Sequence, residues 1–181
     1  MRLILLLLVA ACSPVLAAED CYITDAADGE VTFRVMQAGA PYIGSFRRFI
    51  GEVCFTQGHI THINASLDPS SVDTGLPELD AALKEKDFFA VREFPRVTFV
   101  STSVQSQGGT HTTRGTLEVK GNRHEIEVLF YSLQAGGKMS ISGSLTLDRL
   151  LYDIGTGEWA NTKWLGAEVI LDISARLTRK K

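Results

Sequence analysis

The residues that could do acid–base or metal chemistry in this 181-residue chain are few and poorly placed for a shared site. His59 and His62 lie three positions apart in a stretch of alternating apolar and polar residues. On a strand they would point to opposite faces, so they could not bind one metal ion together. Asp73, Asp80 and Asp87 recur every seven residues, and paired carboxylates could transfer protons. Helix capping and solvation explain these three carboxylates more simply.

The sequence contains no recognisable catalytic motif. H-E-x-x-H, G-x-S-x-G, the P-loop and G-x-G-x-x-G are all absent, and His111 and His124 complete no other known pattern. The formal net charge is −3, and basic residues are not interleaved with aromatic ones as in a nucleic-acid groove. We therefore predict a protein that is not an enzyme, binds no metal and no nucleic acid, and needs no cofactor.

Cysteine usage indicates an oxidising compartment. Apart from Cys12, the chain has two cysteines, Cys21 and Cys54, which lie 33 positions apart. A disulfide between them would stabilise the fold by roughly 3–4 kcal/mol through loop closure. The alternative is a pair of buried free thiols. No C-x-x-C pair is present, so the sequence indicates neither a redox motif nor a cysteine zinc site.

Residues 1–17 have the pattern of a secretory signal peptide. Arg2 precedes an apolar run from Leu3 to Ala11, which is too short to cross a bilayer, and small residues follow it. Cleavage after Ala17 would leave a mature chain of residues 18–181, secreted to a bacterial periplasm. The stretch Val9–Cys12 also resembles a lipobox, so lipidation and membrane anchoring at Cys12 is the alternative.

Alternation of apolar and polar residues predicts strands along most of the mature chain. Short turns separate several of them, which favours antiparallel neighbours. About eight strands with one apolar face can close into a barrel, although a two-sheet sandwich fits the same pattern. A bulge or bend is expected at Arg47 and Arg48, where the pattern breaks. The predicted strands cover residues 30–36, 51–56, 59–68, 96–102, 113–121, 124–132, 138–148 and 167–177.

One short segment between the third and fourth predicted strands has helical spacing. Leu76, Leu79 and Leu83 recur at helical intervals, and Pro77 is a helix-start signal. Two turns of helix cannot stand alone, so the leucines must lie on an apolar surface, which in a barrel is an open end. The segment is then either a plug that completes the core or a lid over a cavity. The predicted rim aromatics are Phe88, Phe89 and Phe94.

Several ordered segments resemble the YceI family of secreted, lipocalin-like, polyisoprenoid-binding proteins, from about Tyr22 to Leu177. The most specific is "DPSSVDTGLPELDAALKEKDFFAVREFPRVTFVST", and the stretches "VTFRV", "GSFRRFIGEVCF", "GTLEVKGNRHEIEV", "LDRLLYDIG" and "LGAEVILDI" resemble other family strands. Two departures concern histidines. Asp28 and Gly29 stand where the family often has a His-Ser pair, and Ala82 stands where it often has a histidine.

The resemblance implies an all-β, eight-stranded antiparallel barrel with a short helical cap, often dimeric, holding an isoprenoid tail. The implied function is non-enzymatic binding, storage or transport of a polyisoprenoid such as a quinone or polyprenyl carrier. Partners would be the lipid, a second copy, and membrane donor or acceptor proteins. The alternative is a solidly packed envelope module that binds a protein through its loops. The predicted cavity residues are Phe33, Val35, Val53, Phe55, Ile63, Leu83, Phe88, Phe89, Phe94, Phe99, Leu117, Val128 and Leu145.

Overall fold

A computed structural model describes residues 19–180, apart from the side chains of residues 25–27. The predicted signal peptide over residues 1–17 and the alternative lipid attachment at Cys12 lie outside the described residues. Within residues 19–180, no helix combines the length and the apolar character that crossing a bilayer requires.

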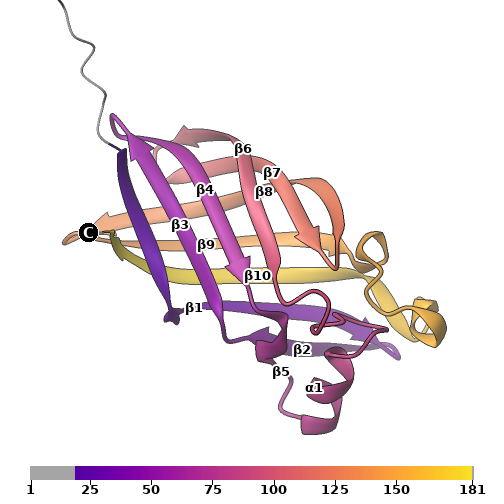
Figure 1. Cartoon of the computed structure of the whole chain (residues 1–181). Helices are drawn as coiled ribbons and strands as arrows, with labels where there is room; N and C mark the ends of the chain where they lie inside the picture. Colours follow the sequence, from indigo (N-terminus) through magenta and orange to yellow (C-terminus); the bar gives the residue numbers. More distant parts are fainter. Residues whose placement is uncertain (1–18, 181) are drawn as a thin grey trace, which may run out of the picture.

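Eight strands form a closed antiparallel barrel, which decides between the barrel and the sandwich (Figure 1). Closure comes from the first and last strands, which pair from Tyr22 opposite Arg179 to Gln37 opposite Leu165. This pairing joins the two ends of the sheet, so neither β1 nor β10 is a free edge strand. All eight predicted strands are present. They are β1 (Glu19–Gln37), β3 (Phe49–Thr56), β4 (His59–Leu67), β6 (Val97–Gln107), β7 (Thr110–Val119), β8 (Asn122–Ala135), β9 (Lys138–Asp148) and β10 (Leu165–Arg179).

Two further strands, which we did not predict, extend one end of the barrel. β1 pairs with β3 over Glu19–Ile23 but with β2 (Ala40–Phe46) over Val31–Gln37. β2 in turn pairs with the two-residue β5 (Val72–Asp73). The expected break at Arg47 and Arg48 is a bend that links β2 to β3, and not a bulge within one strand.

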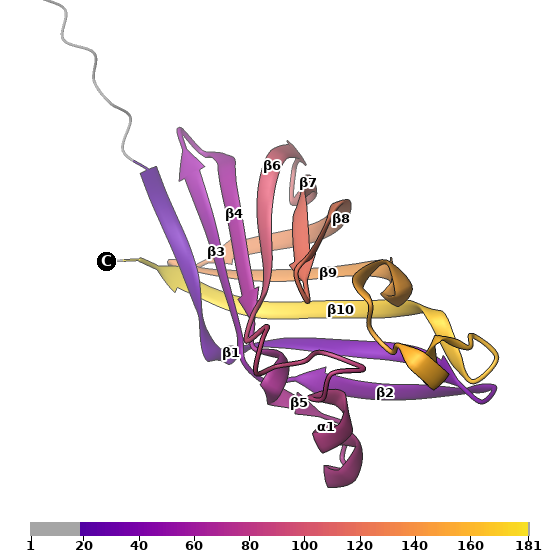
Figure 2. The ribbon, with the colours of Figure 1, turned by 45° about the vertical axis from the view of Figure 1, so that its right-hand side comes forward.

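The helical segments gather at one end of the barrel, which we call the mouth end (Figures 1 and 2). The predicted helix is α1 (Pro77–Leu83), between β4 and β6, and it follows the 3₁₀ turn η1 (Pro69–Ser71). Two more 3₁₀ turns, η2 (Arg149–Tyr152) and η3 (Gly157–Ala160), lie between β9 and β10. The β1–β2 hairpin reaches the same end, and the C-terminus lies at the opposite one.

The opposite end, which we call the floor end, is solidly packed. Ile60, Met139 and Leu177 are almost fully buried there and belong to one apolar cluster with Phe130. His111 is buried beside them, stacked on Phe130, and its two ring nitrogens bond to the hydroxyls of serines 106 and 132. The barrel is therefore closed at this end by side chains.

The predicted disulfide is present. Cys21 and Cys54 face each other across the β1–β3 ladder and are bonded. We expect replacement of both cysteines by serine to lower the free energy of unfolding by about 3 kcal/mol, because the bond closes a long loop in the unfolded chain. Urea unfolding of the double variant checks this value. A wild-type protein with two alkylatable thiols in the absence of reductant would contradict it.

Candidate functional site

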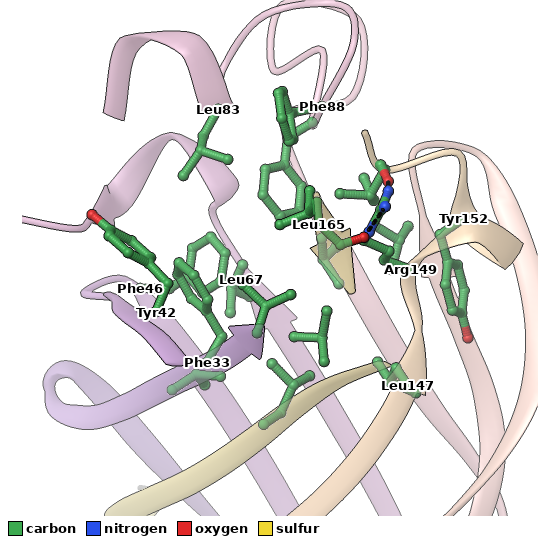
Figure 3. Close-up of a pocket in the computed structure, with 18 of the residues that line it drawn as sticks. Phe33, Tyr42, Phe46, Leu67, Leu83, Phe88, Leu147, Arg149, Tyr152 and Leu165 are labelled. Atoms are coloured by element: carbon green, nitrogen blue, oxygen red, sulfur yellow. Dashed lines mark hydrogen bonds between the residues drawn. The ribbon is translucent and has the colours of Figure 1, made fainter. Parts of the chain in front are cut away.

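The interior of the barrel between the mouth and the floor is hollow. Two cavities lie end to end, a mouth cavity of about 170 Å³ and a deep cavity of about 140 Å³, and only apolar surface faces either of them. Figure 3 shows the side chains that point into the mouth cavity from several strands. The cavities adjoin, because both are lined by Val31, Leu67, Val97, Leu117 and Leu171.

Two aromatic rings lie directly over glycines of the barrel wall. A side-chain carbon on Gly44 would come within 2.4 Å of the Phe33 ring, which faces it across the β1–β2 pair. Likewise, a side-chain carbon on Gly115 would lie 2.6 Å from the ring of Phe99. A larger residue at Gly44 would therefore clash with the Phe33 ring, and one at Gly115 would clash with the Phe99 ring and with the Val100 carbonyl oxygen. The two glycines thus keep bulky apolar side chains close to the wall and leave the centre open.

The helical segment covers the mouth cavity without filling it. Leu79 and Leu83 line the cavity, whereas Leu76 is 52% exposed, so the expectation that all three leucines pack on apolar surface was wrong for Leu76. Behind α1, the Phe89 ring meets Phe46 edge-on at 5.4 Å. No residue of α1 is fully buried. This arrangement favours a lid over a plug.

The three evenly spaced aspartates all hold the lid segment in shape. Asp80 accepts hydrogen bonds from the Thr74 backbone N–H at 2.8 Å and from its hydroxyl at 2.6 Å. Asp73 pairs with Arg47 and accepts from the Gly75 N–H. The Gly75 N–H, followed by the Arg47 guanidinium, lowers the pKa of Asp73, which fixes it as a charged structural group.

The far end of the lid segment is fastened to the loops between β9 and β10. The Asp87 carbonyl accepts from the backbone N–H groups of Gly155 and Thr156 at 2.7 and 2.9 Å, and its carboxylate accepts from the Thr156 hydroxyl. Lys120 donates to the carbonyls of Lys86 and Asp153 at 2.8 and 2.7 Å. The lid is therefore held at both ends, and the leucines of α1 lie between the two anchor points.

Arg149 organises those loops from inside the mouth cavity wall. It is 4% exposed, and all five of its N–H groups donate to backbone carbonyls, none to a carboxylate. Burial lowers the pKa of this guanidinium from its ordinary value. The acceptors are the carbonyls of Ile154, Gly155, Trp159, Leu165 and Gly166, at 2.6–3.0 Å. One side chain thus fixes the loop on one side of the opening.

Eleven of the thirteen predicted cavity residues line one of the two cavities. Phe33, Val35, Leu83, Phe88 and Phe89 line the mouth cavity, and Leu117 lines both. The deep cavity holds the other five, which are Val53, Ile63, Phe99, Val128 and Leu145.

Two predicted residues lie elsewhere. Phe55 meets Tyr22 edge-on, at 5.8 Å between ring centroids, and lines neither cavity. Phe94 lies against Gly121, at the turn between β7 and β8. Phe55 packs against the apolar cluster of the floor end, opposite Ile60 on β4, so it lies beyond the deep cavity.

Several lining residues were not predicted. Tyr42 and Phe46 come from β2, where the alternation Tyr42–Gly44–Phe46 could have indicated a strand. Further lining residues that were not predicted, such as Val31, Leu67 and Leu171, lie on the predicted strands. A third group comes from the start of β10 and from the segment before it, whose sequence has no strand or helix periodicity. They are Arg149, Tyr152, Ile154, Trp159 and Leu165.

Polar residues in the walls present only apolar atoms to the cavities, which limits what the site can do chemically. Gln37 and the tyrosines Tyr42 and Tyr152 line the mouth cavity, and burial raises the pKa of Tyr152. Within residues 19–180, the one histidine, cysteine or carboxylate cluster compact enough for a metal is Glu19, Cys21 and Cys54, and both of its thiols are consumed by the disulfide. The site is suited to hold an apolar molecule.

The fold and the cavity define a lipocalin-like barrel, a closed antiparallel sheet around an apolar cavity under a helical lid. The chain belongs to the YceI family, because the model of the YceI-like domain matches residues 22–177. "Protein YceI" of Salmonella arizonae and of Salmonella paratyphi B are each 33% identical over 94 residues, covering 50% of this chain and 49% of theirs. The match thus spans about half the length of these curated relatives.

Solved structures support the same fold. Burkholderia cenocepacia BcnA is 26% identical, with a TM-score of 0.79 over 84% of this chain and 98% of that one. The Campylobacter jejuni YCEI protein is 19% identical, with a TM-score of 0.68 over 76% and 84% of the two chains. A polyisoprenoid binding domain from Saccharophagus degradans, implicated in plant cell wall breakdown, is 12% identical, with a TM-score of 0.69 over 91% and 100%.

Proposed function

We propose that this protein binds, stores or carries a polyisoprenoid lipid, such as a quinone or a polyprenyl carrier, and catalyses no reaction. The observation that carries the proposal is the pair of adjoining cavities, faced only by apolar surface, beneath a lid. The structural likeness to a domain described as polyisoprenoid binding supports the choice of lipid class. A solidly packed interaction module would need a filled interior, and two cavities remain inside this barrel.

The size of the cavities bears on how much lipid they hold. An apolar cavity of about 150 Å³ in another protein binds benzene, a molecule of six carbons. By that comparison the mouth and deep cavities, at about 170 and 140 Å³, have room for about one five-carbon isoprene unit each. A longer tail requires the lid to move or leaves the remaining units outside the mouth.

The energetics suit a ligand that is mostly hydrocarbon. Burying one isoprene unit is worth roughly 3–4 kcal/mol at about 0.8 kcal/mol per carbon. Two units then supply about 6–8 kcal/mol, which would give a dissociation constant of about 1–40 μM if association cost nothing. Because the loss of translational and rotational freedom costs several kcal/mol, tight binding needs further buried isoprene units or polar contacts at the mouth.

We place this activity in the bacterial periplasm, with exchange through membrane donor or acceptor proteins. The predicted signal peptide over residues 1–17 and the Cys21–Cys54 disulfide support an oxidising compartment outside the cytosol. Intact mass of the purified protein tests export, because a chain starting at Ala18 is expected and a diacylglyceryl group on Cys12 would contradict it. A homodimer stays a prediction.

The proposal is tested by extracting the protein's own ligand. Protein purified without detergent should release an isoprenoid into organic solvent, at a substantial fraction of one molecule per barrel by mass spectrometry. An unrelated periplasmic protein taken through the same purification is the control for carry-over. Recovery of phospholipid acyl chains alone would contradict the lipid class. Recovery of nothing beyond the control would contradict binding.

A further inference from the structure

The mouth end carries a hairpin without charged residues. From Val35 to Phe46, twelve consecutive residues include no acidic or basic side chain, although Arg34 and Arg47 flank them on either side. This run is the tip of the β1–β2 hairpin, which Figures 1 and 2 place at the extreme of the mouth end. Met36 and Ile43 on this hairpin are both large, apolar and exposed.

Both tryptophans of the chain lie beside this hairpin. Trp164 is 61% exposed, and its carbonyl accepts a 2.8 Å hydrogen bond from the backbone N–H of Ala38. Trp159 is 38% exposed, and it shares one groove with Trp164, Gln37, Ala38 and Glu158, the one charged residue that lines this groove. We call the hairpin residues 36–43 together with Trp159 and Trp164 the mouth surface.

The mouth surface continues directly into the mouth cavity. Trp159 belongs to both, since it lines the cavity and meets the Phe88 ring at 5.6 Å between centroids. Gln37 and Tyr42, from the two strands of the same hairpin, also line the cavity. A molecule that leaves the cavity through the mouth therefore passes beside this surface, and whatever covers the surface receives that molecule.

We propose that the mouth surface docks on the surface of a lipid bilayer, so that ligand passes between membrane and cavity without crossing water. This inference rests on the proposed lipid-binding function. Tryptophan prefers the membrane interface, because its ring is apolar and its N–H can remain hydrated. The nearest charges in the sequence, Glu158 and Lys163, have opposite signs. Docking should therefore depend on apolar insertion and need no anionic lipid.

Vesicle binding tests the proposal. The purified protein is mixed with phosphatidylcholine vesicles. Its N-terminus is first established by intact mass, because an apolar leader would itself bind vesicles. Cosedimentation is expected, with tryptophan emission moving to shorter wavelength, since both tryptophans of the chain lie on the mouth surface. Binding should persist at high salt, because exposed charges would be screened and apolar contacts would not.

Matched variants locate the contact. Trp164→Ala should lower the partition coefficient about tenfold, which corresponds to about 1.4 kcal/mol. The control is Tyr131→Ala, because Tyr131 is a 53% exposed aromatic residue on β8 outside the mouth surface, and it should leave binding unchanged. Loss of binding in Tyr131→Ala but not in Trp164→Ala would overturn the proposal. So would the absence of binding, or binding that requires anionic lipid and disappears at high salt.

A second copy of the chain is the competing occupant of the mouth surface. A wild-type dimer that Trp164→Ala converts to monomer, with no vesicle binding, would assign the surface to that copy and overturn bilayer docking. Failure of docking remains distinct from failure of the proposed function, because Trp164 does not line either cavity. Trp164→Ala should therefore release as much isoprenoid on extraction as the wild type.

Discussion

Replacing Arg149 by methionine should lower the free energy of unfolding by about 3–5 kcal/mol, the range seen when one partner of a buried charged interaction is removed. Methionine is flexible and can fill much of the space of the arginine stem, but it donates nothing. Five backbone carbonyls, between Ile154 and Gly166, then lose their donor. Each bond to a charged group contributes about 1.5–3 kcal/mol, although such values do not add for neighbours.

The same substitution should open the mouth even where the barrel stays folded. The segment between β9 and β10 has no helix or sheet pairing of its own beyond two short 3₁₀ turns, and the five bonds from Arg149 are the largest set that one side chain gives it. Hydrogen exchange should accelerate in residues 150–164 and at the lid anchor around Asp87, whose carbonyl bonds to Gly155 and Thr156. Exchange in β3 and β4 should change little.

Arg123→Met is the matched control for this experiment. Arg123 is exposed, and its side chain pairs with Glu118 at 2.8 Å on the outer surface. Exposed pairs contribute at most about 1 kcal/mol, so this variant should unfold near the wild-type midpoint. If Arg149→Met were as mild as Arg123→Met, the loops between β9 and β10 would have to hold their shape without the guanidinium.

Alternation along the chain was enough to predict the barrel strands, because inward positions are apolar whatever they contact inside. It could not say where the interior is hollow. Leu171 and Leu177 both lie on the inward face of β10, yet Leu177 is fully buried in the floor and Leu171 lines both cavities. The difference depends on how many side chains from other strands meet at each level, which is a property of the closed barrel.

The mouth was harder to predict from sequence than the barrel. The hydrogen bonds of Arg149 reach positions up to 17 residues away in the sequence. Their acceptors are backbone carbonyls, which every residue has, so no residue type in the sequence indicates them. The lid was predictable as a helix because its leucine spacing is local, whereas the exposure of Leu76 depends on where the segment lies over the mouth. β2 was missed because Pro41 and Gly44 weaken its strand pattern.

Val128→Trp should separate a ligand cavity from a loosely packed core. Val128 is buried on the inward face of β8 and lines the deep cavity of about 140 Å³. An indole can occupy that space, so the free energy of unfolding should change by less than about 1 kcal/mol, where overpacking a filled core costs about 1–3 kcal/mol. Isoprenoid recovered by extraction should fall several-fold, because the tail loses the deeper of its two binding spaces.

The matched control places the same substitution in a filled part of the structure. Val72 on β5 is 5% exposed, packs in the main apolar cluster and lines neither cavity. Val72→Trp should therefore lower the free energy of unfolding by about 1–3 kcal/mol while the folded fraction keeps its lipid. The same added ring should therefore lower stability at Val72 and lower the amount of bound lipid at Val128. Equal destabilisation at both positions, with lipid content unchanged at Val128, would mean that the deep cavity is not where the tail binds.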